Sequence, residues 1–126
     1  MGHSGPKQIA HEEIVSATDA NSWQHYNKLP FMVSYSCSLM PFDDPSLLSI
    51  GHYILYNPQG GAVSLLASTR SSWAAPSRDF GKSLIDSLFP TEDNQQYPTV
   101  GEAVAYAKNN HTNNIMNTRQ FVLFGD

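Results

Sequence analysis

The chain has 126 residues, the size of one domain, and 40% of them are hydrophobic, which suits a globular protein. Charged residues make up 14%, well below the roughly 25% of typical soluble domains, and uncharged polar residues favour an extracytoplasmic protein. The formal net charge of −4, without a basic stripe, argues against a nucleic-acid partner. The single cysteine excludes an internal disulfide and a cysteine-rich zinc site. No apolar run approaches the roughly 18 residues of a membrane span.

The first third of the chain predicts a loop, a short helix and a strand. Residues 1–8 are rich in glycine and proline and are expected to form a loop. Asp19 is expected to cap a helix over residues 21–26. Residues 31–36 are apolar and β-rich, which indicates a buried strand. Two prolines and two aspartates place residues 38–46 in a loop.

The middle of the chain alternates between helical and strand patterns. Apolar residues recur with a roughly helical period over residues 47–57, and the Asn-Pro-Gln-Gly-Gly segment at residues 57–61 is a strong stop and turn. Residues 62–68 have the length and composition of a strand, and residues 69–78 are expected to be a second loop. The apolar spacing over residues 80–89 predicts an amphipathic helix.

The last third predicts a further helix and strand. Residues 90–98 are a polar linker, and Thr99 is placed to cap a helix over residues 100–109, with Glu102 at the capping-box position. Residues 121–124 predict a final strand. The order of strands and helices is then β, α, β, α, α, β, which implies an α/β layered fold with a mostly parallel sheet. Loops after parallel strands share the carboxyl edge, where open sheets of this kind place their sites.

One pair of residues points to chemistry. His3 lies in a glycine-flanked segment, and Cys37, the only cysteine, directly follows the predicted strand over residues 31–36. A cysteine nucleophile needs a nearby imidazole to hold it as thiolate near neutral pH, and the two need only meet in space. The pair is therefore typical of a cysteine-nucleophile hydrolase. A buried structural cysteine and a frayed terminal histidine are the alternative interpretations.

Short segments along almost the whole chain resemble the C-terminal half of the catalytic domain of the gingipain family, bacterial cysteine peptidases with a caspase-like fold. Gly-His-Ser-Gly at residues 2–5 is similar to the family's histidine loop, and Asn-Lys-Leu-Pro at residues 27–30 is similar to its lead into the nucleophile. Each segment alone is weak, but their order and spacing are specific. The other matching segments are residues 42–45 (Phe-Asp-Asp-Pro), 57–63, 68–70, 73–76, 99–103 and 121–126.

The resemblance implies a caspase-like three-layer sandwich and a set of site residues. Cys37 would be the nucleophile and His3 the general base and then acid, with the backbone N–H groups of Ser4 and Cys37 forming the oxyanion hole. Trp73 would wall the substrate pocket, although a rim aromatic covering the core is an equal alternative. The implied partner is a polypeptide substrate. No cofactor and no metal are expected.

Two segments, residues 42–45 and 57–61, are more similar to the sortase-like signal peptidase of the type IX secretion system than to the gingipains proper. Those enzymes remove a C-terminal secretion signal from cargo at the outer membrane and can pass the cargo to a surface anchor. The resemblance therefore implies an extracytoplasmic location, at the bacterial outer membrane or cell surface or as a secreted protein.

The chain also departs from the family pattern. Ser4 replaces a glycine, Pro41 stands where the sortase-like members have arginine, and His52 stands where the family favours glutamate. The family's strand before the histidine loop and its acidic residue orienting the histidine have no counterpart in the sequence. We therefore expect residues 1–126 to be a single partial domain, incomplete at both ends, which would need the remainder of the parent catalytic domain as its partner.

For most of the other candidate ligand residues we expect structural roles. Asp43 and Asp44 are expected to be turn residues rather than a basic subsite or a calcium site, and Arg70 is left open between binding a carboxylate and capping a strand end. His11, His25, His52 and His111 lack any metal-ligand spacing that includes Cys37, and we expect surface or packing roles.

Three hypotheses follow for function. The first is a cysteine endopeptidase or sortase-like transpeptidase that works through an acyl-enzyme. The second is a non-catalytic caspase-like domain kept for binding or scaffolding. The third is an inactive fragment of an active parent.

Overall fold

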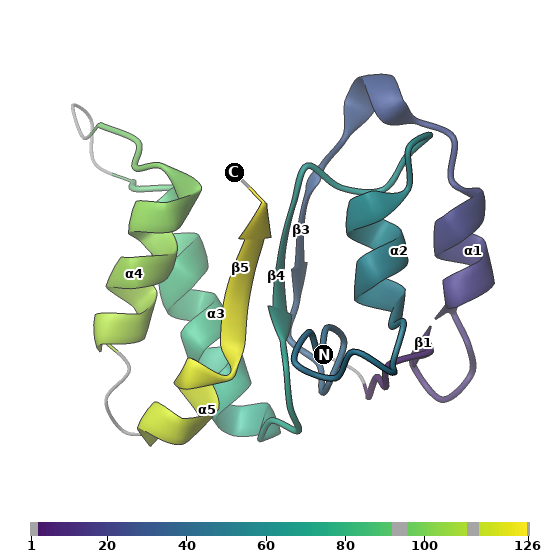
Figure 1. The fold of residues 1–126 in the computed structure, drawn as a ribbon. Coiled ribbons are helices and arrows are strands. Elements are labelled where there is room, and N and C mark those ends of the chain that lie inside the picture. The colour runs from purple at the N-terminus through teal and green to yellow at the C-terminus, as the bar shows by residue number, and fades with distance from the viewer. Residues whose placement is uncertain (1–2, 92–95, 111–113, 126) are drawn as a thin grey trace.

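The computed structural model describes residues 3–91, 96–110 and 114–125. A sheet of three strands lies between two layers of helices (Figure 1). The strands follow the order β3 (Phe31–Ser34), β4 (Ser64–Ser68), β5 (Phe121–Gly125). One face is covered by α1 (Ala17–Ser22) and α2 (Ile50–Tyr56), and the other by α3 (Ala74–Leu88) and α4 (Val100–Asn110). The α/β three-layer sandwich expected from the sequence is confirmed.

The central strand β4 explains why the sheet has two cores. All five of its residues are buried, and successive side chains point to opposite faces. Leu65 and Ala67 pack towards α1 and α2, and Leu66 packs towards α3 and α4. The first core is completed by Ala20, Leu39, Met40, Ile50, Ile54 and Ala62, and the second by Phe80, Leu84, Ala103, Val104, Ala107 and Phe121.

The strand directions differ in part from the expectation. β3 and β4 are parallel, with Phe31 opposite Ser64, but β4 and β5 are antiparallel, with Leu66 opposite Leu123, so the sheet is mixed. The short helix α2 joins β3 to β4 and returns the chain to the edge at which β3 began. Between β4 and β5 the two long helices α3 and α4 run in opposite directions (Figure 1). The chain therefore re-enters the sheet at the end where β4 finishes, with Phe121 opposite Ser68. That second helix reverses the last strand.

The N-terminal segment is more ordered than a loop. β1 (Gln8–Ile9) and β2 (Val15–Ser16) form a small antiparallel hairpin. The expected helix over residues 21–26 was wrong, because the first helix is α1. Ser16 is its N-cap: the Ser16 hydroxyl accepts from the Asp19 N–H at 3.1 Å, and the Asp19 carboxylate accepts from the Ser16 N–H at 2.8 Å. Asp19 is thus the third residue of the capping box and not the cap.

Of the two later long helices, α4 begins at the expected residue, whereas the expected start of α3 was wrong. α3 starts at Ala74, inside the expected loop, because Pro76 lies in its first turn, where no backbone N–H is needed. The capping box of α4 is confirmed: the Thr99 N–H donates to the Glu102 carboxylate at 2.8 Å, and the Glu102 N–H donates to the Thr99 hydroxyl at 3.3 Å. A short 3₁₀ turn (Tyr26–Lys28) and α5 (Ile115–Arg119) complete the described elements.

The Asn-Pro-Gln-Gly-Gly turn at residues 57–61 locks the α1–α2 layer to the sheet. The Asn57 amide nitrogen donates to the Ala20 and Trp23 carbonyls, both at 3.0 Å, and so satisfies the end of α1. Gly61 adopts φ +92°, and its backbone lies directly against the Ile54 carbonyl at the end of α2. A side chain at Gly61 would strike that carbonyl, which is why glycine is required there.

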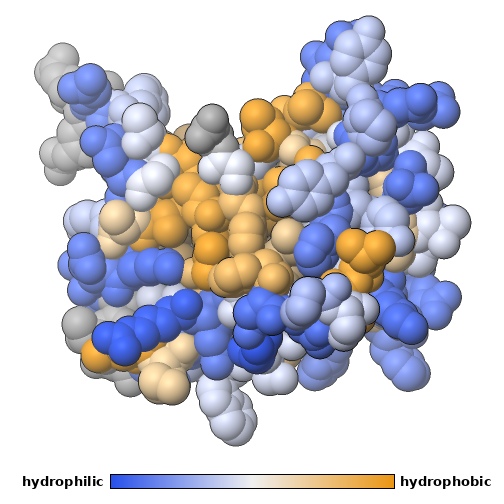
Figure 2. Space-filling view, viewed as in Figure 1, coloured by the Kyte–Doolittle hydropathy of each residue, from blue (hydrophilic) through white to orange (hydrophobic). Residues whose placement is uncertain are grey.

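β5 is an edge strand with an apolar flank. Figure 2 shows hydrophobic side chains gathered along this strand, between α4 and α2. Phe42, which is 53% exposed, packs edge-on against Phe124 of β5, with the ring centroids 5.5 Å apart. Within the described parts of the chain, no helix has the length and apolar character needed to cross a membrane.

Candidate active site

Cys37 lies in the turn that leaves β3, at the carboxyl edge shared with β4. Ser38, the next residue, has φ +47°, in the left-handed region that serine rarely adopts. The Ser38 N–H donates to the Arg70 carbonyl at 3.1 Å, and the Met40 N–H donates to the Ser68 carbonyl at 3.2 Å. The loops after the two parallel strands are therefore joined through their backbones beside Cys37, as the expected edge placement requires.

The Cys37 thiol is partly exposed and faces the loop after β4. Its sulfur accepts from the Ser72 N–H at 3.4 Å and lies 3.4 Å from the Ser72 carbonyl oxygen. The Ser72 backbone therefore offers the sulfur both a donor and an acceptor. The thiol is thus a half-exposed group with a donor in place and not a core residue.

The histidine-bearing segment reaches the same edge. The Ala10 N–H donates to the His3 carbonyl at 2.7 Å, which folds the segment back on itself. The Ser4 hydroxyl donates to the Cys37 carbonyl at 2.5 Å, across 33 residues of sequence. The two loops that the sequence singled out therefore touch. The His3 side chain itself is exposed, and within the described structure its imidazole makes no hydrogen bond with the Cys37 thiol.

The Ser4 backbone N–H, the expected oxyanion donor, lies in an isolated bridge between the histidine segment and Ile9. Ser4 and Ile9 form an antiparallel bridge whose hydrogen bonds come from the flanking residues, from the Ala10 N–H to the His3 carbonyl and from the Gly5 N–H to the Gln8 carbonyl at 3.0 Å. In such a pair the N–H of the bridged residue points away from its partner. The Ser4 N–H is therefore not used by the bridge.

Trp73 follows Ser72 directly and projects from the start of α3, with 74% of its surface exposed. Its backbone N–H donates to the side-chain carbonyl of Asn117 at 2.6 Å. Asn117 is buried, and its amide nitrogen donates to the Ser77 hydroxyl at 3.2 Å. The indole is thus free to meet a ligand while its backbone is held from beneath.

A cavity of about 410 Å³ opens beside His3. It is formed by the folded-back N-terminal segment, including Ser4, Lys7 and His11, together with Leu47 from the loop before α2. His3 and Lys7 both line this cavity, and Cys37 is not among its lining residues.

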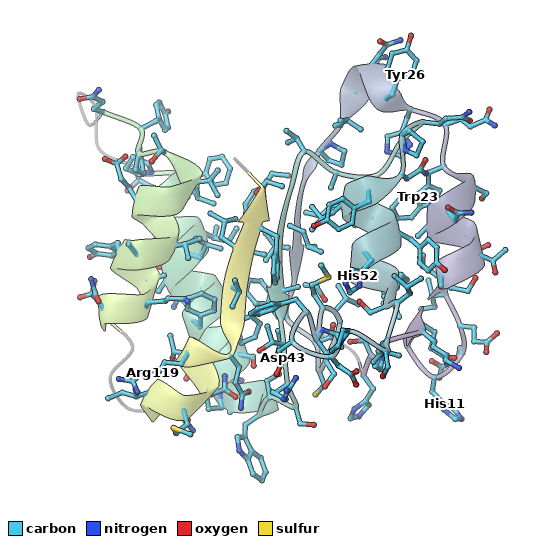
Figure 3. The ribbon with its side chains drawn as sticks, in the orientation of Figure 1. His11, Trp23, Tyr26, Asp43, His52 and Arg119 are labelled. Carbon is cyan, nitrogen blue, oxygen red and sulfur yellow. The ribbon has the colours of Figure 1, made fainter. Side chains whose placement is uncertain are left out.

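Asp43 and Arg70 connect the two loops on the other side of Cys37. The Arg70 guanidinium donates to both carboxylate oxygens of Asp43, at 2.8 Å for the Nη1 to Oδ1 pair. These hydrogen bonds lower the pKa of Asp43. Asp43 lies at this end of the sheet in Figure 3. Asp44 accepts from the Ser46 N–H at 3.0 Å, which confirms a turn role for it.

The remaining histidines have local contacts where they are described. The His25 ring nitrogen is 3.0 Å from the Gly61 carbonyl oxygen, and His52 is the third residue of the α2 capping box with Ser49. His11 is exposed, and His111 lies outside the described residues. The described ranges contain no cluster of three or more histidine, cysteine, aspartate or glutamate side chains suited to a metal ion.

The model of peptidase family C25 matches residues 1–126. The chain belongs to peptidase family C25. This confirms the gingipain-family resemblance inferred from the sequence segments. The more specific sortase-like assignment is not addressed by this match. No curated protein matches the sequence significantly.

Two solved structures of this family share the fold. The Arg-specific cysteine proteinase gingipain R (RgpB) superposes with a TM-score of 0.74 at 17% identity, over 100% of this chain and 31% of that chain. The complex of Porphyromonas gingivalis RgpB pro- and mature domains gives a TM-score of 0.73 at 15% identity, with the same shares covered. The chain therefore spans about a third of the length of these C25 structures.

Two polar residues at this C25 site escaped the sequence reasoning. Ser36 is buried next to Cys37, and Asn117 is buried beneath Trp73. The sequence pattern could have indicated Ser36, because Ser34 and Ser36 alternate at the end of an otherwise apolar strand and so share one face. No comparable pattern indicates Asn117, because it lies 44 residues from the backbone group that it holds.

Proposed function

We propose that this chain carries the nucleophile and the general base of a cysteine peptidase. Cys37 is the nucleophile, His3 is the base and then the acid, and the backbone N–H groups of Ser4 and Cys37 stabilise the oxyanion. Trp73 walls the substrate pocket, and the substrate is a polypeptide. The observation that carries the proposal is the Ser4–Cys37 contact, which brings the histidine loop onto the nucleophile loop in a chain of family C25.

The proposed reaction has two steps. The Cys37 thiolate attacks a peptide carbonyl, and the tetrahedral oxyanion is met by the two backbone donors. Collapse of this intermediate breaks the C–N bond, and the His3 imidazolium gives its proton to the leaving amine. Neutral His3 then takes a proton from water, which attacks the thioester, releases the acid and restores the thiolate–imidazolium pair. An amine acceptor in place of water would give transpeptidation.

The test is the alkylation of Cys37, since a single cysteine gives a signal without background. Near neutral pH, iodoacetamide should modify the wild-type chain roughly tenfold or more faster than His3→Ala, because an unassisted thiol is only a few per cent thiolate there. His11→Ala is the matched control, because His11 is another exposed histidine on the same cavity. Equal rates in all three proteins would overturn the dyad.

A non-catalytic binding domain is the second candidate. It is favoured by the lack of a hydrogen bond between the described His3 and Cys37 side chains, and by the orientation of the sulfur towards Ser72. The peptidase candidate is compatible with the same geometry, because catalytic hydrogen bonds are often long in unliganded structures and tighten with substrate. The His3→Ala alkylation experiment separates the two candidates.

We further propose that residues 1–126 form one part of a larger catalytic domain that acts outside the cytoplasm, in sortase-like processing of secreted cargo. The 31% coverage of the two C25 structures supports the first part of this proposal. The similarity of residues 42–45 and 57–61 to the sortase-like members supports the second. Incubating the longer parent with a cargo peptide and an amine acceptor tests it: an acceptor-linked product is expected, and hydrolysis alone would contradict sortase-like transfer.

A further inference from the structure

A row of three serine hydroxyls runs from the end of β3 to the histidine loop. The Ser34 and Ser36 oxygens are 2.5 Å apart, and the Ser36 and Ser4 oxygens are 2.7 Å apart. The Ser4 hydroxyl also contacts the Cys37 carbonyl at 2.5 Å. The row therefore begins in the sheet and ends on the backbone of the proposed nucleophile.

The surroundings of this row are apolar. Strand alternation puts Ser34 and Ser36 on the same side of β3 as Met32, which packs into the α1–α2 core. Ser36 is 7% exposed, and its neighbours around a 250 Å³ cavity include Ile9, Leu39 and Leu65. A hydroxyl in such a place is costly unless it is hydrogen-bonded, so the contacts with Ser34 and Ser4 are what make Ser36 tolerable there.

Ser4 is the donor at its end of the row. Its hydroxyl donates both to the Cys37 carbonyl and to the Ser36 hydroxyl, so one proton is shared between two acceptors. Because Ser36 accepts from Ser4, its own proton is left for the contact with Ser34, in which either hydroxyl can donate. All three hydroxyls therefore have a partner.

The row is also the direct tie between the two loops. Other hydrogen bonds fold the histidine segment on itself or attach it elsewhere, as the Ile50 N–H does to the Pro6 carbonyl at 2.6 Å. Among the described residues, the hydrogen bonds that join residues 3–10 to residues 34–38 all pass through the Ser4 hydroxyl. His3 is the residue next to Ser4, so its distance from Cys37 depends on this tie.

We propose that Ser36 is a positioning residue that clamps the histidine loop onto the nucleophile loop through Ser4. The catalytic role of this clamp rests on the proposed function, whereas the clamp between the two loops exists independently of it. Ser4 stands where the family resemblance expects glycine, and its side chain supplies a contact that glycine lacks. The clamp thus belongs to this chain's own sequence.

Amide hydrogen exchange of the full chain tests the clamp. In Ser36→Ala, exchange at Gly5 and Ala10 should rise roughly two- to tenfold, the equivalent of one hydrogen bond. Ser36→Thr keeps the hydroxyl, and the adjoining cavity has room for its methyl group, so this variant should restore wild-type exchange. Ser46→Ala, which removes an exposed hydroxyl bonded to Asp44, is the control and should leave these amides unchanged. Unchanged exchange in Ser36→Ala overturns the clamp.

Alkylation then tests positioning. The rate difference between chains with and without His3→Ala should shrink in the Ser36→Ala background and return with Ser36→Thr; a difference that persists overturns the positioning role. If His3→Ala has no effect in the wild-type background, the proposed function fails while exchange still decides the clamp. Should Ser36→Ala not fold, Ser4→Ala breaks the same tie from a half-buried position, with the same expected and contradicting results.

Discussion

The side-chain carbonyl of buried Asn117 accepts a hydrogen bond from the backbone N–H of Trp73 at 2.6 Å, and its amide nitrogen donates to Ser77. One side chain from α5 thus fixes the start of α3, immediately after the Ser72 N–H that faces the Cys37 sulfur. The proposed pocket wall and the thiol donor are therefore held by a buried residue whose side chain hydrogen-bonds to Trp73 and Ser77.

Asn117→Ala should destabilise the protein by about 1–3 kcal/mol, because it leaves the Trp73 N–H and the Ser77 hydroxyl without their buried partner. Urea unfolding measures this loss. Asn110→Ala is the control: its amide bonds an exposed carbonyl at the end of α4, and its removal should change stability far less. Equal effects in the two variants would show that Asn117 does not have this anchoring role.

The left-handed Ser38 backbone makes a second prediction. Ser38→Val should lower the free energy of unfolding by about 1–3 kcal/mol, because a β-branched residue is strongly disfavoured at φ +47°. Ser38→Gly adopts this conformation without strain and should stay close to the wild type. Thermal unfolding of both variants checks the prediction, which is wrong if valine is tolerated as well as glycine.

Alanine substitutions at two glycines are expected to change the stability of the protein in opposite directions. Gly61→Ala should destabilise by about 2 kcal/mol or more, because the new Cβ would lie 2.0 Å from the Ile54 carbonyl oxygen at φ +92°. Gly101 lies in the first turn of α4 with open space around it, so Gly101→Ala should stabilise the protein by about 0.5–1 kcal/mol. Denaturant midpoints test both, and a stable Gly61→Ala would contradict the described turn.

The surroundings of Tyr35 predict that the stability of the protein falls at alkaline pH. Burial raises the pKa of Tyr35 to about 12 from the ordinary value of about 10. The unfolded chain loses this proton first, so between about pH 10 and 12 it binds fewer protons than the folded chain, and stability falls as pH rises. The difference in stability between the wild type and Tyr35→Phe should change in this window and be constant at lower pH. A constant difference up to pH 12 would contradict the raised pKa.

Local signals in the sequence were sufficient where one segment decides its own structure. The Thr99–Glu102 capping box, the apolar strands and the glycine-rich turn at residues 57–61 all involve neighbours within a few residues. The helix start at Ser16 was misplaced although its Ser-x-x-Asp box is equally local, so this signal was present and overlooked. Family segments likewise pointed to His3 and Cys37 before their loops were seen to touch.

Long-range contacts decided the rest. The antiparallel direction of β5 depends on how α3 and α4 pack, and no residue of the strand encodes it. The Ser4–Ser36–Ser34 row and the Asn117 anchor join residues 32 and 44 positions apart, where hydrogen bonds form only after the sheet has assembled. The sequence by itself determined the elements and the chemical types of the site residues, because these follow from local periodicity and side-chain chemistry. Only the tertiary structure decided which of those residues meet, because contact across a sheet edge depends on the packing of every layer behind it.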